Sequence, residues 1–248
     1  MSERTHAYVC TVSDINYLPK GLALYSSLCM TEGRNFSLFW LCLDNFVYLE
    51  LEKLKLENVK TFLLPAAGQV ELIHARLLPK SNYGDEEANF IWRIIPWFVR
   101  RTLVNEVPAG EKLVYADADI FFYRPPSIIT CYLLGSKAVG IHTHRFQGPY
   151  DPDKDTGWYN VGVMVFTNNE VGYIIADAWK NWVFESKSPL YEKYSTCGDQ
   201  RWLNLFIPAF GKDNICVFDE SPGYTHLAPW NVDNLEFPIH QDGQLHVV

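Results

Sequence analysis

The chain lacks several features that mark large functional classes. No apolar run approaches the length of about 18 residues that a membrane-spanning helix needs, and no secretory leader pattern opens the sequence. Positive charge is in the minority, with 21 Lys and Arg against 29 Asp and Glu, a net charge of −8. This balance argues against a nucleic-acid binder, which needs clustered positive charge, although the local pair Arg100-Arg101 remains. We therefore expect a cytoplasmic protein without a transmembrane segment, a location that still allows peripheral contact with the cytoplasmic membrane face.

Familiar phosphate-binding and nucleophile motifs are missing as well. The sequence contains no Gly-x-x-x-x-Gly-Lys-Ser/Thr loop, no Gly-x-Gly-x-x-Gly after the first expected strand and no Gly-x-Ser-x-Gly elbow. Their absence argues against P-loop nucleotide hydrolysis, dinucleotide redox chemistry and serine hydrolysis. The 6 cysteines lie far apart and form no Cys-x-x-Cys pair, so neither a zinc site nor a disulfide framework is predicted.

Hydrophobic periodicity predicts an α/β fold. Strands are expected at 7–12, 37–43, 59–64, 112–116, 138–142 and 160–166, and helices at 18–30, 46–56, 68–104 with a kink or break near Pro96, 128–134, 171–184 and 199–206. Strands that alternate with helices imply a mainly parallel sheet covered on both faces. No linker composition divides the 248 residues, so we expect one domain over 1–248. The long polar stretch 143–157 shows the hydrophobic period of neither a helix nor a strand, which predicts a mobile lid or an acceptor-binding loop.

The most informative motif is the Asp-x-Asp sequence Asp117-Ala118-Asp119, which follows the apolar run 112–116. A strand that ends in two carboxylates delivers them to the carboxyl edge of the sheet, where open α/β folds place their ligands. Acids between apolar stretches must be paired, hydrogen-bonded or metal-bound. Mn²⁺ and Mg²⁺ prefer oxygen ligands and share their remaining positions with substrate phosphates. We predict that Asp117 and Asp119 bind such a metal; the simpler alternative is two solvated acids in a turn.

A phosphatase that uses an aspartate nucleophile is a weaker interpretation of this motif. Such enzymes place the pair on their first strand and follow it with a small hydroxyl residue. Here the pair lies near the middle of the chain, and Ile120 follows it.

Six segments together resemble the nucleotide-sugar-dependent glycosyltransferases of the GT-A fold, close to family 8 and its bacterial relatives. In chain order they are 8–18 with the later Ser26-Ser27-Leu28, then 115–120, His144-Arg145, 159–163, 198–203 and 228–231. Each segment is weak evidence by itself, but their order and spacing are specific and span most of the chain. The resemblance implies a Rossmann-like mixed sheet, mainly parallel, with helices on both faces. It also implies metal-dependent transfer of a hexose from a nucleotide diphosphate, most simply a UDP-sugar, to a saccharide or lipid-linked glycan in polysaccharide biosynthesis.

The resemblance also assigns roles to individual residues. It implies donor binding by Val12, Asp14, Tyr17, Arg93, Asp117, Ala118, Asn160 and Gly162, catalysis by Asp199 and Gln200, and acceptor binding by His144, Arg145, Trp230 and Asn231. A carboxylate at Asp14 can accept a hydrogen bond from a base, and the ring of Tyr17 can stack on it. Retention of configuration is implied by the likeness to family 8, whereas the residues themselves leave retaining and inverting chemistry open.

Each assignment has a structural alternative. Asp14 and Asp199 are also suited to cap helices, Arg93 to be an ordinary surface charge, and Gly162 to mark a bulge. Aromatic residues such as Trp230 are most often part of the core.

One departure from the family concerns the third metal ligand, a histidine in a His-Phe-x-Gly-like segment. The chain stops at 245–248, so either His240 or His246 substitutes or the protein is truncated, and the apolar ending favours truncation with lower metal affinity. Two other functions stay open. A sugar nucleotidyltransferase shares the architecture but carries a Gly-rich basic loop where this chain has 13–17. An inactive glycan-binding or scaffold protein would explain the missing ligand.

Overall fold

A computed structural model describes residues 6–64, 76, 86–131, 137–144, 151, 156–184, 189–194, 198–218, 240–241 and 244–245. The strands are β1 (Ala7–Ser13), β2 (Phe36–Cys42), β3 (Val59–Leu63), β4 (Lys112–Ala116), β5 (Val139–Thr143), β6 (Tyr159–Thr167), β7 (Ile215–Val217), β8 (His240–Gln241) and β9 (Gln244–Leu245). The helices are α1 (Leu18–Glu32), α2 (Asn45–Leu54), α4 (Glu86–Asn105), α5 (Pro126–Cys131), α6 (Glu170–Phe184), α7 (Pro189–Tyr194), the 3-10 helix η2 (Arg201–Leu205) and α8 (Phe206–Phe210).

The main sheet has seven strands in the order β3-β2-β1-β4-β6-β5-β7. Parallel pairs join β3 to β2, β2 to β1, β1 to β4 and β5 to β7, whereas β6 runs antiparallel to both of its neighbours. The predicted mixed and mainly parallel sheet is therefore confirmed. Because β1 and β4 are adjacent and parallel, their carboxyl ends meet at one edge of the sheet.

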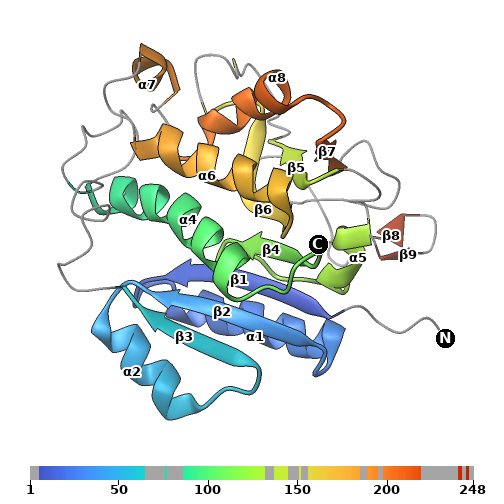
Figure 1. Ribbon diagram of the computed structural model, residues 1–248. Coiled ribbons are helices and arrows are strands. Elements are labelled where there is room, and N and C mark those ends of the chain that lie inside the picture. Colours follow the sequence, from blue (N-terminus) through green and yellow to red (C-terminus); the bar gives the residue numbers. More distant parts are fainter. Residues whose placement is uncertain are drawn as a thin grey trace.

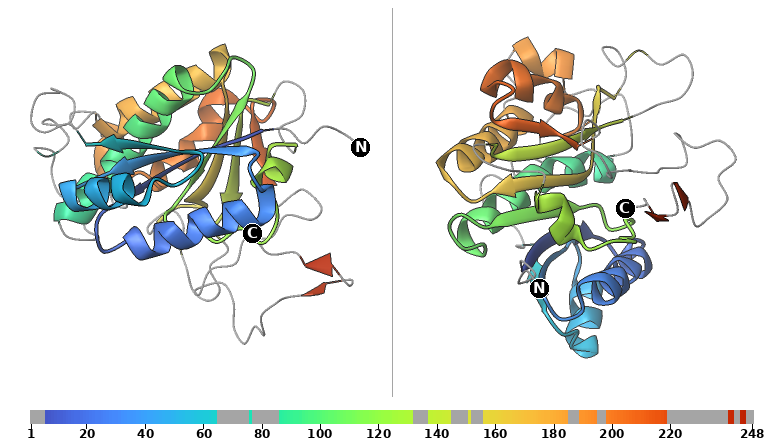
Figure 2. Two further views of the ribbon diagram at one scale, coloured as in Figure 1. Left: turned by 90° about the horizontal axis from the view of Figure 1, so that it is seen from below. Right: turned by 90° about the vertical axis from the view of Figure 1, so that its right-hand side faces the viewer.

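Helices cover both faces of the sheet. Figure 2 shows α4 and α6 on one side and α1 on the other, and Figure 1 shows α4 and α6 lying side by side. Alternate residues of β1 serve the two layers: Cys10 and Val12 pack in the core beneath α4 and α6, whereas Ala7 and Val9 pack beneath α1 and α2. A strand buried on both faces has a nearly continuous apolar sequence.

Helix α4 passes through Pro96 without a break, so of the kink or break predicted near that residue the break is wrong. Proline removes one backbone donor from the helix. Ile94, Ile95 and Phe98 surround it and are all buried, and their packing holds the helix together across the missing hydrogen bond. The rest of the helix expected at 68–104 lies outside the described residues except for Arg76, which is helical.

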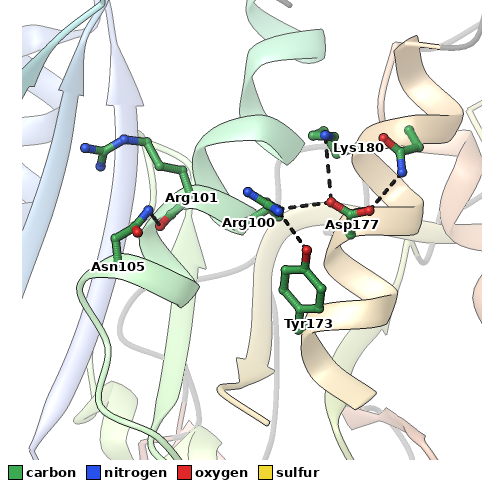
Figure 3. A network of polar contacts seen from close by, with 7 residues as sticks. Arg100, Arg101, Asn105, Tyr173, Asp177 and Lys180 are labelled. Atoms are coloured by element: carbon green, nitrogen blue, oxygen red, sulfur yellow. Dashed lines mark hydrogen bonds and ion pairs between the residues drawn. The ribbon is translucent and has the colours of Figure 1, made fainter. Parts of the chain in front are cut away.

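The pair Arg100-Arg101 serves internal contacts rather than a binding surface. Arg100 Nε donates to Asp177 Oδ1 at 3.0 Å, and the guanidinium also donates to the Tyr173 hydroxyl at 2.7 Å, which joins α4 to α6. Figure 3 shows Arg101 pointing away from this network. Its guanidinium lies 4.7 Å from the centre of the Phe62 ring. No helix among the described residues is long and apolar enough to cross a membrane.

Candidate functional site

A pocket of about 460 Å³ opens at the edge where β1 and β4 end. Ten of the residues singled out from the sequence line it: Val12, Asp14, Tyr17, Asp117, Ala118, Asp119, His144, Asn160, Asp199 and Gln200. They come from the end of β1 and the β1–α1 loop, the turn after β4, the residue after β5, the start of β6 and the turn before η2. The fold thus brings together residues as far apart in the chain as Val12 and Gln200.

Hydrogen bonds from β4 and β6 hold the Asp117–Asp119 turn in place. The backbone N–H of Asp117 donates to the carbonyl of Gly162 at 2.9 Å, and the N–H of Ile120 closes the turn on the Asp117 carbonyl at 3.0 Å. The buried hydroxyl of Tyr115 donates to Asp117 Oδ1 at 2.6 Å. These bonds hold one carboxylate in place before any ligand arrives.

Negative charge is concentrated in this part of the pocket. Burial raises the pKa of Asp117 to about 6; the nearby charge of Asp119 adds to this rise, and the hydrogen bond from Tyr115 opposes it. Burial also raises the pKa of Asp199 well above its ordinary value, and the charge of Asp117 contributes. Burial and the neighbouring acids therefore disfavour ionisation of both carboxyl groups, a cost that a bound cation would relieve.

Asp117 and Asp119 fit a hard cation through their chemistry. Mg²⁺ commonly takes one or two carboxylates from the protein and leaves its other positions to water and substrate phosphates. In the part of the chain that the structure describes, no three His, Cys, Asp or Glu side chains form a group that could hold a metal ion. His246 lies outside the described residues and the side chain of His240 is not described, so the identity of a third ligand stays a prediction.

The β1–α1 loop is held in shape by two aspartates. Asp14 Oδ1 accepts from the N–H of Tyr17 at 2.9 Å, and Asp14 Oδ2 accepts from the Asn16 amide at 3.0 Å. Asp44, which caps α2, accepts from the N–H of Ile15 at 2.9 Å. Asp14 thus stabilises the turn before α1, close to the capping alternative, although the N-cap residue of α1 is Tyr17. Tyr17 is 44% exposed and lines the pocket, where its ring can stack on a flat ligand.

Gln200 connects three parts of the site. Its Oε1 accepts from the Asn160 amide at 3.1 Å and from the N–H of Val161 at 3.4 Å, and its Nε2 donates to the carbonyl of Thr156 at 3.1 Å. Asn160 Oδ1 in turn accepts from the N–H of Gly162 at 2.7 Å. This network links the end of the long loop to β6 and to the backbone that supports Asp117.

Asp199 differs from its neighbour in having an unsatisfied oxygen. Its carboxyl group is buried, and Oδ2 has no hydrogen-bond partner among the described residues. Its backbone carbonyl accepts from the indole of Trp179 at 3.0 Å, which fixes the turn. The capping alternative does not hold, because the N-cap residue of η2 is Gln200 and makes no side-chain cap bond. The predicted helix from 199 begins instead as a turn.

Other predicted site residues lie outside the pocket lining. Gly162 acts through its backbone, as described above. Arg93 is only 5% exposed on α4, so the alternative of a surface charge is wrong, and its contact with phosphates stays a prediction. Arg145, Trp230 and Asn231 lie outside the described residues, as does most of the predicted loop at 143–157.

The sequence reasoning missed one wall of the pocket. Helix α4 supplies Ala88, Ile91, Trp92 and Ile95, which are spaced as one face of a helix. That spacing is visible in the sequence, but it does not say whether the face meets a core or a cavity. Gly198 was missed too. Its φ is positive, at +54°, and a Cβ there would lie 2.6 Å from the Trp92 Cβ.

Several solved structures share the fold of this chain. No family model matches the sequence. The chain is 28% identical to the uncharacterized protein YfnF of Bacillus subtilis (strain 168), over 97% of this chain and 77% of that protein. The galactosyltransferase LgtC, solved with donor and acceptor sugar analogs, superposes with a TM-score of 0.59 at 13% identity, over 90% of this chain and 76% of that one. Mouse xyloside xylosyltransferase 1 gives a TM-score of 0.57 at 13% identity, over 91% and 89%. The chain therefore has the GT-A fold.

Proposed function

We propose that this protein is a metal-dependent glycosyltransferase. It transfers a hexose from a nucleotide diphosphate donor to a hydroxyl of a saccharide or lipid-linked glycan, with retention of configuration. The donor that we propose is a UDP-sugar. The fold that it shares with LgtC and xyloside xylosyltransferase 1 supports the reaction class. The cytoplasmic location expected from the sequence is part of the same proposal.

One observation carries the proposal: the Asp117–Asp119 turn, the β1–α1 loop and the Asp199-Gln200 pair line a single pocket. A nucleotide sugar needs a base-binding surface, a place for its diphosphate and a reacting centre. Asp14 and Tyr17 suit the base, and the two acids after β4 suit a cation beside the diphosphate. The volume of about 460 Å³ lies within the range of small-molecule sites.

The chemistry of the donor explains why acids suit this place. Negative charge develops on the diphosphate as its bond to the sugar breaks, and a divalent ion held by Asp117 and Asp119 would supply Lewis-acid stabilisation of that charge. The protein's own contribution is to hold Asp117 rigidly through Tyr115 and Gly162. A preformed ligand needs little reorganisation when the donor binds.

Asp199 is the better candidate of the catalytic pair to face the sugar. The side-chain oxygen of Gln200 already accepts from Asn160 and Val161, whereas Asp199 Oδ2 has no such partner in the described residues. A carboxylate near the reacting carbon would stabilise the cationic sugar. Gln200 would act mainly by holding β6 and the loop in register. His144, 5% exposed and part of the lining, remains our proposed acceptor contact.

Ligand binding tests the donor assignment directly. Thermal unfolding is measured with UDP, GDP, CDP and dTDP, each with and without Mn²⁺, for the wild type and Asp117→Asn. A ligand at about 100 times its Kd stabilises the native state by about 2.7 kcal/mol. We expect a Mn²⁺-dependent rise with UDP in the wild type that is lost in Asp117→Asn. The exposed Asp213→Asn variant controls for loss of one negative charge.

Turnover separates the proposal from its alternatives. With Mn²⁺ present, the wild type is expected to hydrolyse a UDP-hexose slowly and to stop when EDTA is added. A protein that binds glycans without catalysis would hydrolyse none. If no nucleotide diphosphate raises the melting temperature with Mn²⁺, the donor assignment is wrong.

A further inference from the structure

The pocket described above has an unbalanced charge. Its described lining includes the four carboxylates of Asp14, Asp117, Asp119 and Asp199 but no lysine or arginine. A nucleotide diphosphate would add further negative charge to this surface. One divalent ion offsets only part of the total, so a diphosphate calls for another positive group near the turn after β4.

Lys20 stands at the place where that group is needed. It lies in the first turn of α1, and its Nζ is 3.4 Å from Asp119 Oδ2 and 4.0 Å from the centre of the Tyr17 ring. Both of these partners line the pocket. Lys20 therefore connects the proposed base-binding loop, which precedes it directly, with the proposed metal-binding turn, where Asp119 is 99 residues away along the chain.

The exposed ion pair between Lys20 and Asp119 contributes little to the stability of the fold, so its partners can change at little cost. The side chains of Lys20 and Asp119 are 49% and 46% exposed, and exposed pairs of this kind contribute little to stability. A lysine ammonium is a compact charge with three donors on a flexible four-carbon stem. It binds phosphate oxygens as a point charge, and a small movement of the stem changes its partner.

We propose that Lys20 is a donor-binding residue that exchanges Asp119 for the diphosphate. In the ligand-free protein its ammonium neutralises Asp119. With that carboxylate bound to a divalent ion, the ammonium would donate to an oxygen of the diphosphate instead, while the Lys20 side chain stays beside Tyr17. This inference rests on the proposed function, and it adds a residue that neither the sequence motifs nor the pocket lining identify.

The matched pair Lys20→Met and Lys53→Met tests the exchange. Methionine keeps an unbranched apolar stem and removes the charge. Lys53 is an exposed lysine on α2 that pairs with Glu50 at 2.6 Å, so it controls for the loss of a surface ion pair. Calorimetric titrations use Mn²⁺ alone, UDP with saturating Mn²⁺, and uridine, which has no phosphates. Lys20→Arg serves as the conservative variant.

We expect Lys20→Met to raise the Kd of UDP with Mn²⁺ about tenfold, since a charge-assisted hydrogen bond is lost from a partly exposed site. Uridine affinity should change by less than about twofold, because uridine offers no phosphate to the ammonium and methionine keeps an apolar side chain beside Tyr17. Mn²⁺ alone should bind as well or slightly more tightly, since no ammonium competes for Asp119. Lys20→Arg should keep most of the UDP affinity, and Lys53→Met should match the wild type.

The results separate the two claims. If the wild type binds UDP with Mn²⁺ and Lys20→Met binds it equally well, the role of Lys20 is refuted and the proposed function stands. An equal loss for UDP and uridine would also refute it, since Lys20 would then act only through the shape of the loop. If the wild type ignores UDP with Mn²⁺, the proposed donor site and the role of Lys20 both fail.

Discussion

Replacing Asp117 with asparagine is expected to stabilise the ligand-free protein at neutral pH, although it removes a proposed metal ligand. The pKa of Asp117 rises from 3.8 to about 6, because the protein encloses the carboxyl group and Asp119 lies near it. Asparagine keeps an oxygen that can accept the hydrogen bond from Tyr115, and it carries no charge. The variant therefore avoids the cost of ionising a poorly solvated acid.

The sign and size of the effect follow from the two pKa values. Between pH 3.8 and about 6 the folded protein keeps a proton that the unfolded chain has released, so the stability of the wild type falls as the pH rises through this window. A rise of about two pKa units corresponds to at most about 3 kcal/mol above pH 7. About 1.3 kcal/mol of this appears between pH 5 and 7. For a chain of this size, 3 kcal/mol is about 6 to 12 °C in melting temperature.

Urea unfolding at pH 5, 6, 7 and 8 without metal measures the difference between Asp117→Asn and the wild type. The difference should favour the variant increasingly up to pH 7 and then level off, whereas the exposed control Asp213→Asn should show no such trend. Adding Mn²⁺ should stabilise the wild type and leave Asp117→Asn unchanged. A difference that stays constant from pH 5 to 8 would refute the argument that Asp117 is destabilised by its surroundings.

Two further substitutions test the contacts that shape the pocket. Gly198→Ala forces a side chain into a left-handed conformation at φ +54° and against Trp92, so it should cost about 2 to 3 kcal/mol and weaken UDP binding. Gly110→Ala, at φ +84° in the turn that Glu111 N–H closes on the Pro108 carbonyl, meets nothing within 4 Å and should cost only about 1 kcal/mol. Gln200→Glu places an oxygen where Nε2 now donates to the Thr156 carbonyl, so urea unfolding should show a loss of about 1 to 3 kcal/mol at pH 8. Equal losses in the two glycine variants, or an unchanged Gln200→Glu, would contradict the contacts described here.

The strands were the most predictable part of the molecule. The strand expected at 112–116 is β4, Lys112–Ala116, and the first strand differs from β1 only at its end. Both are buried on two faces, so their sequences are continuous apolar runs with clear ends. The strand order was not predictable in the same way. It depends on which long-range pairings form, and the antiparallel β6 between β4 and β5 has no local signature.

The segment after Gly198 shows where periodicity fails. One helix was expected at 199–206, but a turn comes first, then η2, then α8. Pro208 accounts for one missing α-helical bond, because it has no N–H to donate to the carbonyl of Asn204. Asn204 instead accepts the N–H of Trp158 at 2.8 Å through its side chain. Proline was visible in the sequence, whereas the partner 46 residues away was not.

The candidate site also combines residues that local sequence predicts with residues that only long-range packing brings together. Asp117 could be predicted because a strand and its two acids are adjacent in sequence, and a parallel neighbour such as β1 must end at the same edge. Asp199 reaches that edge only through packing, since the indole of Trp179 on α6 holds its backbone carbonyl at 3.0 Å. Its placement brings two carboxyl groups whose pKa values are both raised into one pocket, at a cost that the core beneath α4 and α6 must offset. A fold under no functional demand would gain stability by losing either acid. That unfavourable pairing is therefore the strongest physical reason to look for a cation at this site.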